Sequence, residues 1–289
     1  MNSGRRAAIA ELVAIGCIGA WNFGRARVRN RVRISATLAA AGAVLGVARA
    51  GGARASELGL SPTSAARGAR LGARAAAPVA LAVAAVVAVP RTRRLVHDEK
   101  ISATSPREAA FETFVRIPLE TAVAEELIFR GALLALGTRA RSRPSAIVTS
   151  SLCFGAWHVV PTLGSLARGA DTEALPTPAS TVAVVAATSV AGLGFAMLRV
   201  RSDSVVAPII VHATLNMVAF AGIRATAGRR PLPQAGDPVA QQCEREQHDD
   251  HRGHRAPVAD QPVANLVQDA DRPAGRDEQK DDRDQQRQQ

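Results

Sequence analysis

The chain has 289 residues, 47% of them hydrophobic, and 36 Lys and Arg against 25 Asp and Glu give a formal net charge of +11. Such a charge is typical of nucleic-acid-binding proteins, but here the arginines stand at the ends of apolar runs and not in one stripe interleaved with aromatic residues. This distribution argues against nucleic acid as a partner. It favours arginines that flank membrane helices and contact anionic lipid.

Apolar runs of about 20 residues, the length that crosses a bilayer, recur along the chain. The sequence predicts an all-α, polytopic transmembrane bundle of about seven to eight helices. A Gly/Arg/Ser-rich connector over 51–73 is expected to carry a short surface helix starting at Ser61-Pro62, and 162–178 is expected to be a loop. The runs cover residues 7–23, 34–50, 74–90, 108–136, 144–160, 179–200 and 203–223.

Gly42 and Gly46 have the GxxxG spacing that lets a second helix approach closely. We expect helix packing there.

Composition divides the chain into three parts: N-terminal transmembrane helices (1–50), a core (51–228) and a polar C-terminal tail (229–289). The tail has ten basic and thirteen acidic residues, no aromatic residue and few apolar ones, so we expect it to be disordered. The positive-inside rule places Arg139–Arg143 and Arg199–Arg201 in the cytoplasm, but basic residues in the early loops leave the overall orientation open. The composition is typical of a bacterial protein of the plasma membrane.

Three islands of ionisable or hydrogen-bonding residues interrupt the apolar runs. Ionised groups at membrane depth cost roughly 2.5–3.5 kcal/mol each on insertion scales, so they usually face a cavity and have a function. In "VAEELIFRGALLALG", Glu126 and Arg130 are one helical turn apart and can pair, which leaves Glu125 pointing about 100° away. The other islands are "FGAWH", ending in His158, and "HATLN", with His212 and Asn216 on one face.

Each island alone is compatible with interhelical hydrogen bonding. Together, on three separate helices, their polar groups could meet in one buried pocket and form a hydrolytic site. The chain contains no HExxH, no GxSxG and no tyrosine, which excludes a zincin site, a serine nucleophile elbow and tyrosine-based aspartyl motifs. Water activated by carboxylate and histidine remains, with or without a metal.

The order EExxxR, FxxxH and HxxxN on successive hydrophobic segments resembles the CPBP family, the type II CAAX prenyl proteases and bacteriocin-processing enzymes also called the Abi family. The resemblance covers about residues 55–225, and all six motif positions match. It implies an intramembrane endopeptidase in which Glu125 activates water with help from His158. Glu126 and Arg130 would then orient and charge-balance the site.

By the same resemblance, His212 and Asn216 would stabilise the oxyanion of the tetrahedral intermediate. The family has been described both as metalloproteases and as metal-independent glutamate proteases. In the metal version Glu125, His158 and His212 would hold zinc with a position open for water.

The expected partners are membrane lipid and a membrane-associated peptide or protein substrate. Two rival functions stay open: a non-proteolytic membrane protein that binds and regulates a partner, and a small ion-coupled transporter. No internal repeat of the kind common in transporters is evident.

Overall fold

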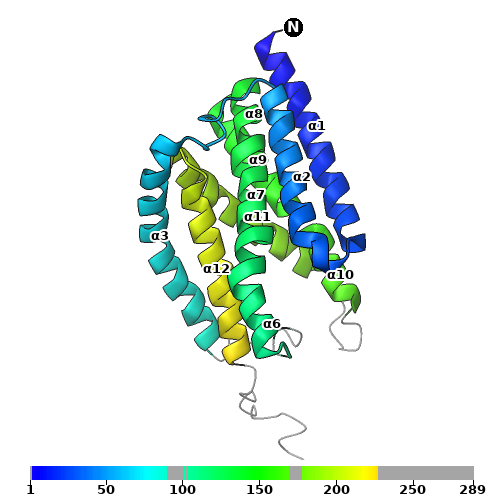
Figure 1. The fold of residues 1–289 in the computed structure, drawn as a ribbon, viewed down its shortest axis with the longest axis vertical. Coiled ribbons are helices and arrows are strands. Elements are labelled where there is room, and N and C mark those ends of the chain that lie inside the picture. The colour runs from blue at the N-terminus through cyan, green and yellow to red at the C-terminus, as the bar shows by residue number, and fades with distance from the viewer. Residues whose placement is uncertain (1, 90–100, 102, 169–177, 227–289) are drawn as a thin grey trace, which may run out of the picture. The chain divides into compact units, whose positions relative to one another are not determined.

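The computed structural model describes residues 2–89, 101, 103–168 and 178–226, which form helices and turns with no strand. The predicted all-α fold is therefore confirmed (Figure 1). The tail predicted to be disordered lies outside the described residues. The elements are α1 (Ser3–Gly24), η1 (Arg25–Arg27), α2 (Asn30–Ala50), α3 (Pro62–Ala88), α6 (Pro106–Phe111), η2 (Glu112–Val123), α7 (Ala124–Glu126), η3 (Leu127–Leu133), α8 (Leu134–Ala140), α9 (Arg143–Trp157), α10 (Val159–Arg168), α11 (Pro178–Ser202) and α12 (Val206–Ala225).

Within the described part of the chain, six helical segments are long and apolar enough to cross a membrane. They comprise α1 with η1, α2, α3, α9 running on into α10, α11 and α12. A further continuous helical stretch, Pro106–Ala140, is more polar and carries the first predicted site motif. The chain is thus an integral, multi-pass membrane protein.

Two boundaries differ from the sequence prediction. Residues 62–73 are not part of a connector but form the first three turns of α3. This helix begins at Pro62, where the missing N–H of proline costs no hydrogen bond. Residues 162–168, predicted to be loop, belong to α10. The helix α9 ends at Trp157, and Pro161 lies in the first turn of the following helix, α10.

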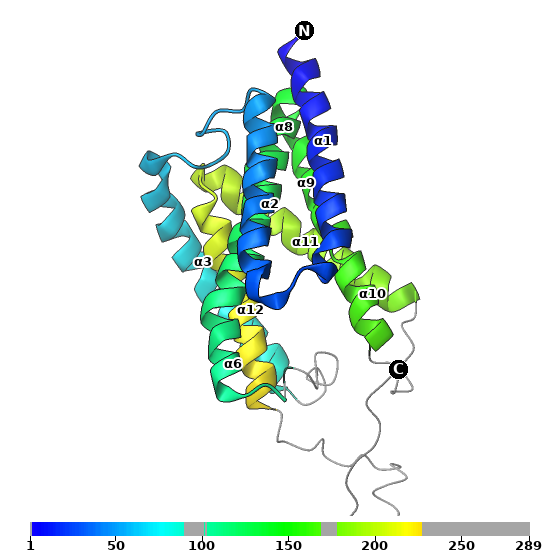
Figure 2. The ribbon, with the colours of Figure 1, turned by 45° about the vertical axis from the view of Figure 1, so that its right-hand side comes forward.

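α3 runs parallel to α12, α9 runs antiparallel to α11, and α1 lies beside α2 and α8 (Figures 1 and 2). Small residues allow the α3–α12 approach, because a Cβ at Gly68 would lie 2.7 Å from Ser204 Cβ and one at Gly72 would lie 2.9 Å from Ala207 O. The expectation for Gly42 and Gly46 is wrong within the described residues, since a Cβ at either glycine would have no neighbouring atom within 4 Å.

Residues Pro106–Ala140 form the centre of the bundle. Every residue from Ile128 to Gly137 is buried, although Arg130 lies among them. Two π-helical segments, η2 and η3, flank the short α-turn α7 that contains both glutamates. π-helical turns are rare and often occur at functional sites, because they change the direction of the side chains that follow.

The two GxxxG pairs give a matched test of this packing. Gly72→Ala should lower the free energy of unfolding by about 1–3 kcal/mol, because the methyl group would overlap α12. Gly42→Ala should be neutral or slightly stabilising, since its Cβ meets open space and alanine favours the helix. Thermal unfolding of both purified variants checks this; equal stability would contradict the α3–α12 contact.

Candidate active site

A fully buried ion pair lies at the centre of the site. Arg130 Nη1 donates to Glu126 Oε1 at 3.0 Å, and neither side chain is exposed to any extent. His212 Nδ1, on α12, is 2.9 Å from the same carboxylate oxygen. The predicted pairing of Glu126 with Arg130 one turn later is confirmed, and the first and third polar islands meet as expected.

The guanidinium of Arg130 is enclosed by aromatic rings. Its Cζ lies 4.2 Å from the centroid of Phe154 and 5.1 Å from that of Phe195. Phe195 in turn stacks on the His212 imidazole at 4.8 Å with 22° between the ring planes. Arg130 Nη2 also donates to Gly192 O at 3.1 Å. The rings attract the cation and exclude lipid and water from it, so the pair is held rigidly.

Glu125 faces away from this pair, as its helical position predicts. Its Oε1 accepts a hydrogen bond from Trp157 Nε1 at 3.0 Å. Its Oε2 is buried and has no hydrogen-bond partner, and His212 Nε2 lies 4.0 Å away. A buried carboxylate oxygen without a partner loses its hydration without compensation, so this atom is suited to hold a water molecule or a substrate group.

His158 and Asn216 are less enclosed. His158 follows directly after α9, is partly buried, and contacts Phe154 O through Nδ1 at 2.8 Å, which leaves Nε2 for other partners. Asn216 lies one turn after His212 on α12, is partly buried, and makes no hydrogen bond to another described residue. The structure thus brings Glu125, Glu126, Arg130 and His212 into direct contact or near contact and leaves the Asn216 amide unengaged.

A cavity of about 620 Å³ connects Glu125 with His158. Charged side chains of α2 and η2 form another part of its wall. They include the ion pairs Arg33–Glu120 at 2.9 Å and Arg116–Glu112 at 2.5 Å. The lining residues are Asn22, Arg25, Ala26, Arg33, Glu112, Arg116, Glu120, Thr121, Glu125, Trp157, His158, Val160, Pro161 and Gly164. The site therefore has a polar, water-compatible chamber beside a carboxylate.

Sequence reasoning missed two residues of the site. Trp157 holds Glu125 and lies within the FGAWH motif, directly before the histidine that was selected. Arg25 comes from the α1–α2 turn, and its guanidinium lies 4.7 Å from the centroid of the Trp157 rings. Trp157 could have been selected from the sequence, because it carries an indole N–H donor directly before the motif histidine His158. Arg25 could not, because it is one of five arginines in "GRARVRNRVR" that the sequence does not distinguish.

The positions of the His, Cys, Asp and Glu side chains bear on the predicted zinc site. Among the described residues, no group of three or more His, Cys, Asp or Glu side chains is placed to hold a metal ion. Glu125 and His212 approach each other, but the described His158 contact is to Phe154 O. Glu125, His158 and His212 therefore do not form a three-ligand centre in this conformation, and zinc binding by them stays a prediction.

The fold and the site define a polytopic membrane protein with a buried site of carboxylates, histidines and an arginine. Residues 108–218 match the family model described as Type II CAAX prenyl endopeptidase Rce1-like, and this region includes all six predicted site residues. No curated protein and no solved structure matches the chain. The match of residues 108–218 to this model agrees with the resemblance of the three motifs to a family of intramembrane endopeptidases.

Trp157→Phe should lower the turnover of a cleaved substrate about tenfold with little change in KM, because Glu125 would lose the donor that fixes its rotamer. Trp21→Phe is the matched control, since the buried Trp21 Nε1 has no hydrogen-bond partner and its removal should leave turnover unchanged. Steady-state kinetics of both variants decide this. Equal effects of the two substitutions would contradict a specific role for the Trp157 hydrogen bond.

Proposed function

We propose that the chain is an intramembrane endopeptidase that cleaves a membrane-associated peptide or protein with water activated by Glu125. The observation that carries the proposal is Glu125 Oε2, a buried carboxylate oxygen without a hydrogen-bond partner, in a residue that lines the 620 Å³ cavity together with His158. A general base needs an oxygen that is protected from bulk solvent and within hydrogen-bond reach of the attacking water. Glu125 Oε2 is buried, and in the proposed reaction water reaches it from the cavity that Glu125 lines.

In the proposed reaction Glu125 Oε2 accepts a proton from water while the water oxygen attacks the scissile carbonyl carbon. The carbonyl electron pair moves to oxygen and produces a tetrahedral oxyanion. Glu125 then returns the proton to the amide nitrogen, the C–N bond breaks, and a carboxylic acid and an amine leave. His158 helps to hold the attacking water, since its Nε2 is left for that purpose by the Nδ1 contact with Phe154.

His212 and Asn216 are assigned to the oxyanion. Glu126 fixes the imidazole of His212 through Nδ1, and Phe195 stacks on its face, so Nε2 has one orientation. When both nitrogens carry a proton, Nε2–H can donate to the oxyanion. The unengaged amide of Asn216 supplies a second donor. Arg130 balances the charge of Glu126 and keeps it available to His212.

The family implies CAAX-type processing, in which a bond close to the C-terminus of a prenylated protein is cleaved. The substrate we propose for this chain is broader, because its composition is that of a bacterial protein and bacteria seldom prenylate proteins. Maturation of a bacteriocin, self-immunity and cleavage of a membrane regulator fit the same site.

Glu125→Gln should reduce peptide cleavage by about 10²–10⁴-fold, the usual contribution of general base catalysis, while the protein still folds. Glu108→Gln, an exposed carboxylate of the same helical stretch, is the control and should retain activity. A comparison of the membrane proteomes of cells with the wild type and with Glu125→Gln also identifies the substrate. Cleavage and phenotype that both survive Glu125→Gln would refute the protease and favour a binding or regulatory role.

Chelation tests the metal question separately. The mechanism above requires no metal ion, so we expect protein treated with chelator to keep its activity and elemental analysis to find less than one zinc per chain. Stoichiometric zinc that is lost together with activity would overturn this version. It would assign Glu125, His158 and His212 to a metal centre that forms in another conformation.

A further inference from the structure

A second cavity, of about 360 Å³, lies away from the catalytic chamber, where the C-terminal ends of α8 and α11 meet the N-terminus of α9 and the loop before α3. The two cavities lie toward opposite ends of α1: Asn22 lines the catalytic chamber, whereas a Cβ at Gly4 would lie 3.7 Å from Arg139 O beside the second cavity. The residues that line it are Ser56, Glu57, Leu134, Ala135, Thr138, Arg139, Arg143, Arg199, Val200 and Asp203.

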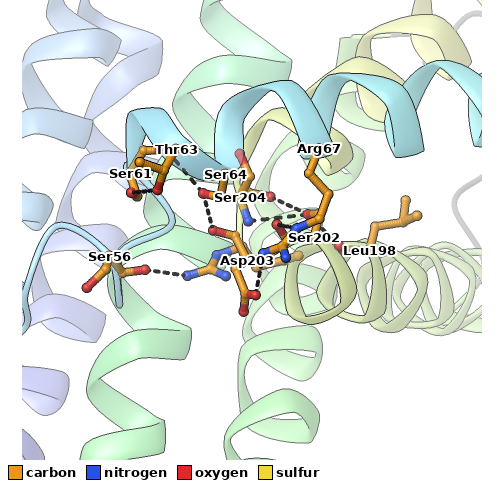
Figure 3. A network of polar contacts seen from close by, with 10 residues as sticks. Ser56, Ser61, Thr63, Ser64, Arg67, Leu198, Ser202, Asp203 and Ser204 are labelled. Atoms are coloured by element: carbon orange, nitrogen blue, oxygen red, sulfur yellow. Dashed lines mark hydrogen bonds and ion pairs between the residues drawn. The ribbon is translucent and has the colours of Figure 1, made fainter.

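The lining contains three arginines and two acids, and the acids are already paired. Arg139 Nη1 donates to Glu57 Oε1 at 2.8 Å. Burial opposes the ionisation of Glu57, but hydrogen bonds from the Arg54 amide and from Arg139 outweigh it and lower the pKa of Glu57. Asp203 is paired with Arg67, which lies outside the lining (Figure 3). The positive charge of the cavity is therefore not neutralised from within.

Arg199 is one of the two arginines without a carboxylate partner. It is only 6% exposed, and its Nη2 donates at 2.7 Å to Glu57 O, with a longer bond to Ser56 O. Its Nε has no partner. The loop is shaped around this side chain, because Gly59 has a positive φ of 74° and any Cβ there would collide with the guanidinium. Asp203 lies close enough to act on Arg199 electrostatically but forms no ion pair with it, so this buried cation favours a bound anion.

Arg143 is the second such arginine. It is the exposed first residue of α9 and has no ion pair or hydrogen bond within the described residues. The preceding residue, Ser142, does not cap the helix with its side chain, so the amide groups of the first turn are not satisfied by it. The positive end of the α9 dipole therefore adds to the charge of Arg143.

The floor of the cavity is apolar. Leu134 and Val200 line it, and both pack in the cluster formed with Ala146, Ile147 and Ala196. Arginines above an apolar floor, at the level where membrane helices end, suit a group whose anionic head lies at the interface and whose remainder is hydrophobic.

We propose that this second cavity binds a phosphate group, and that the phosphate is the headgroup of an anionic membrane lipid. Arg143 and Arg199 contact the phosphate oxygens, and the backbone N–H groups of Arg143 and Ser145 contribute, since Pro144 between them has none. The placement at the helix ends and the apolar floor favour lipid over free phosphate as the source.

The test uses the full-length protein and native mass spectrometry with phosphatidylglycerol or phosphatidylcholine. Phosphatidylglycerol should bind preferentially, and Arg143→Gln should weaken its apparent affinity about fivefold, corresponding to roughly 1 kcal/mol for one interfacial arginine. Arg143→Glu should weaken it further, while a carboxylate at the start of α9 preserves the helix. Arg201→Gln is the control, because Arg201 is exposed at the same end of α11 but does not line the cavity.

Equal loss in Arg143→Gln and Arg201→Gln would overturn the site, since general surface charge would then explain the binding. Equal affinity of wild type and Arg143→Glu would overturn it as well. Inorganic phosphate is the second probe. If inorganic phosphate competes with phosphatidylglycerol only at concentrations far above those of the lipid, the lipid assignment stands. If inorganic phosphate raises the thermal stability of the wild type as much as phosphatidylglycerol does, the lipid assignment is wrong.

Discussion

The buried pair of Glu126 and Arg130 is the interaction on which the rest of the site depends. Both side chains are fully enclosed, and loss of one partner would leave an uncompensated charge at a cost of about 3–5 kcal/mol. The surroundings are therefore arranged around the pair: aromatic rings close over the guanidinium, Gly192 supplies a carbonyl, and His212 shares the carboxylate. These contacts come from α9, α11 and α12, so one ion pair ties three helices to the central one.

This arrangement separates the roles of two adjacent carboxylates. Glu126 contacts a cation and an imidazole through Oε1 and has a fixed position, and its Oε2 has no hydrogen-bond partner. Glu125 points the other way, lines the cavity, is held through one oxygen by Trp157, and has a second, buried oxygen that lies 4.0 Å from His212 Nε2. The different environments follow from helix geometry, because neighbouring positions differ by about 100° in direction. In the proposed function this difference makes one glutamate a scaffold and the other a base.

The motifs of the chain were predictable to different degrees. The Glu126–Arg130 pair follows from spacing alone, since residues four apart on a helix are neighbours. Close helix packing at a GxxxG spacing was expected at Gly42 and Gly46, but it occurs at Gly68 and Gly72. The two pairs have the same spacing, so only the position of α12 distinguishes them. Likewise, Pro161 is a helix breaker in sequence terms, yet it lies within the first turn of α10, because the preceding helix has already ended.

By itself the sequence determined the all-α membrane class, the polar islands and their family, because these depend on local composition, on helical periodicity and on the order of short motifs. Tertiary structure alone decided which arginines serve a site. Arg25 and Arg199 look like other membrane-flanking arginines in the sequence, yet one lies over the indole that holds Glu125 and the other is buried in a loop shaped around it. The physical reason is that helices far away in the chain set the burial and the partners of a long, flexible side chain. Its sequence neighbours fix only the position of the backbone from which the side chain extends.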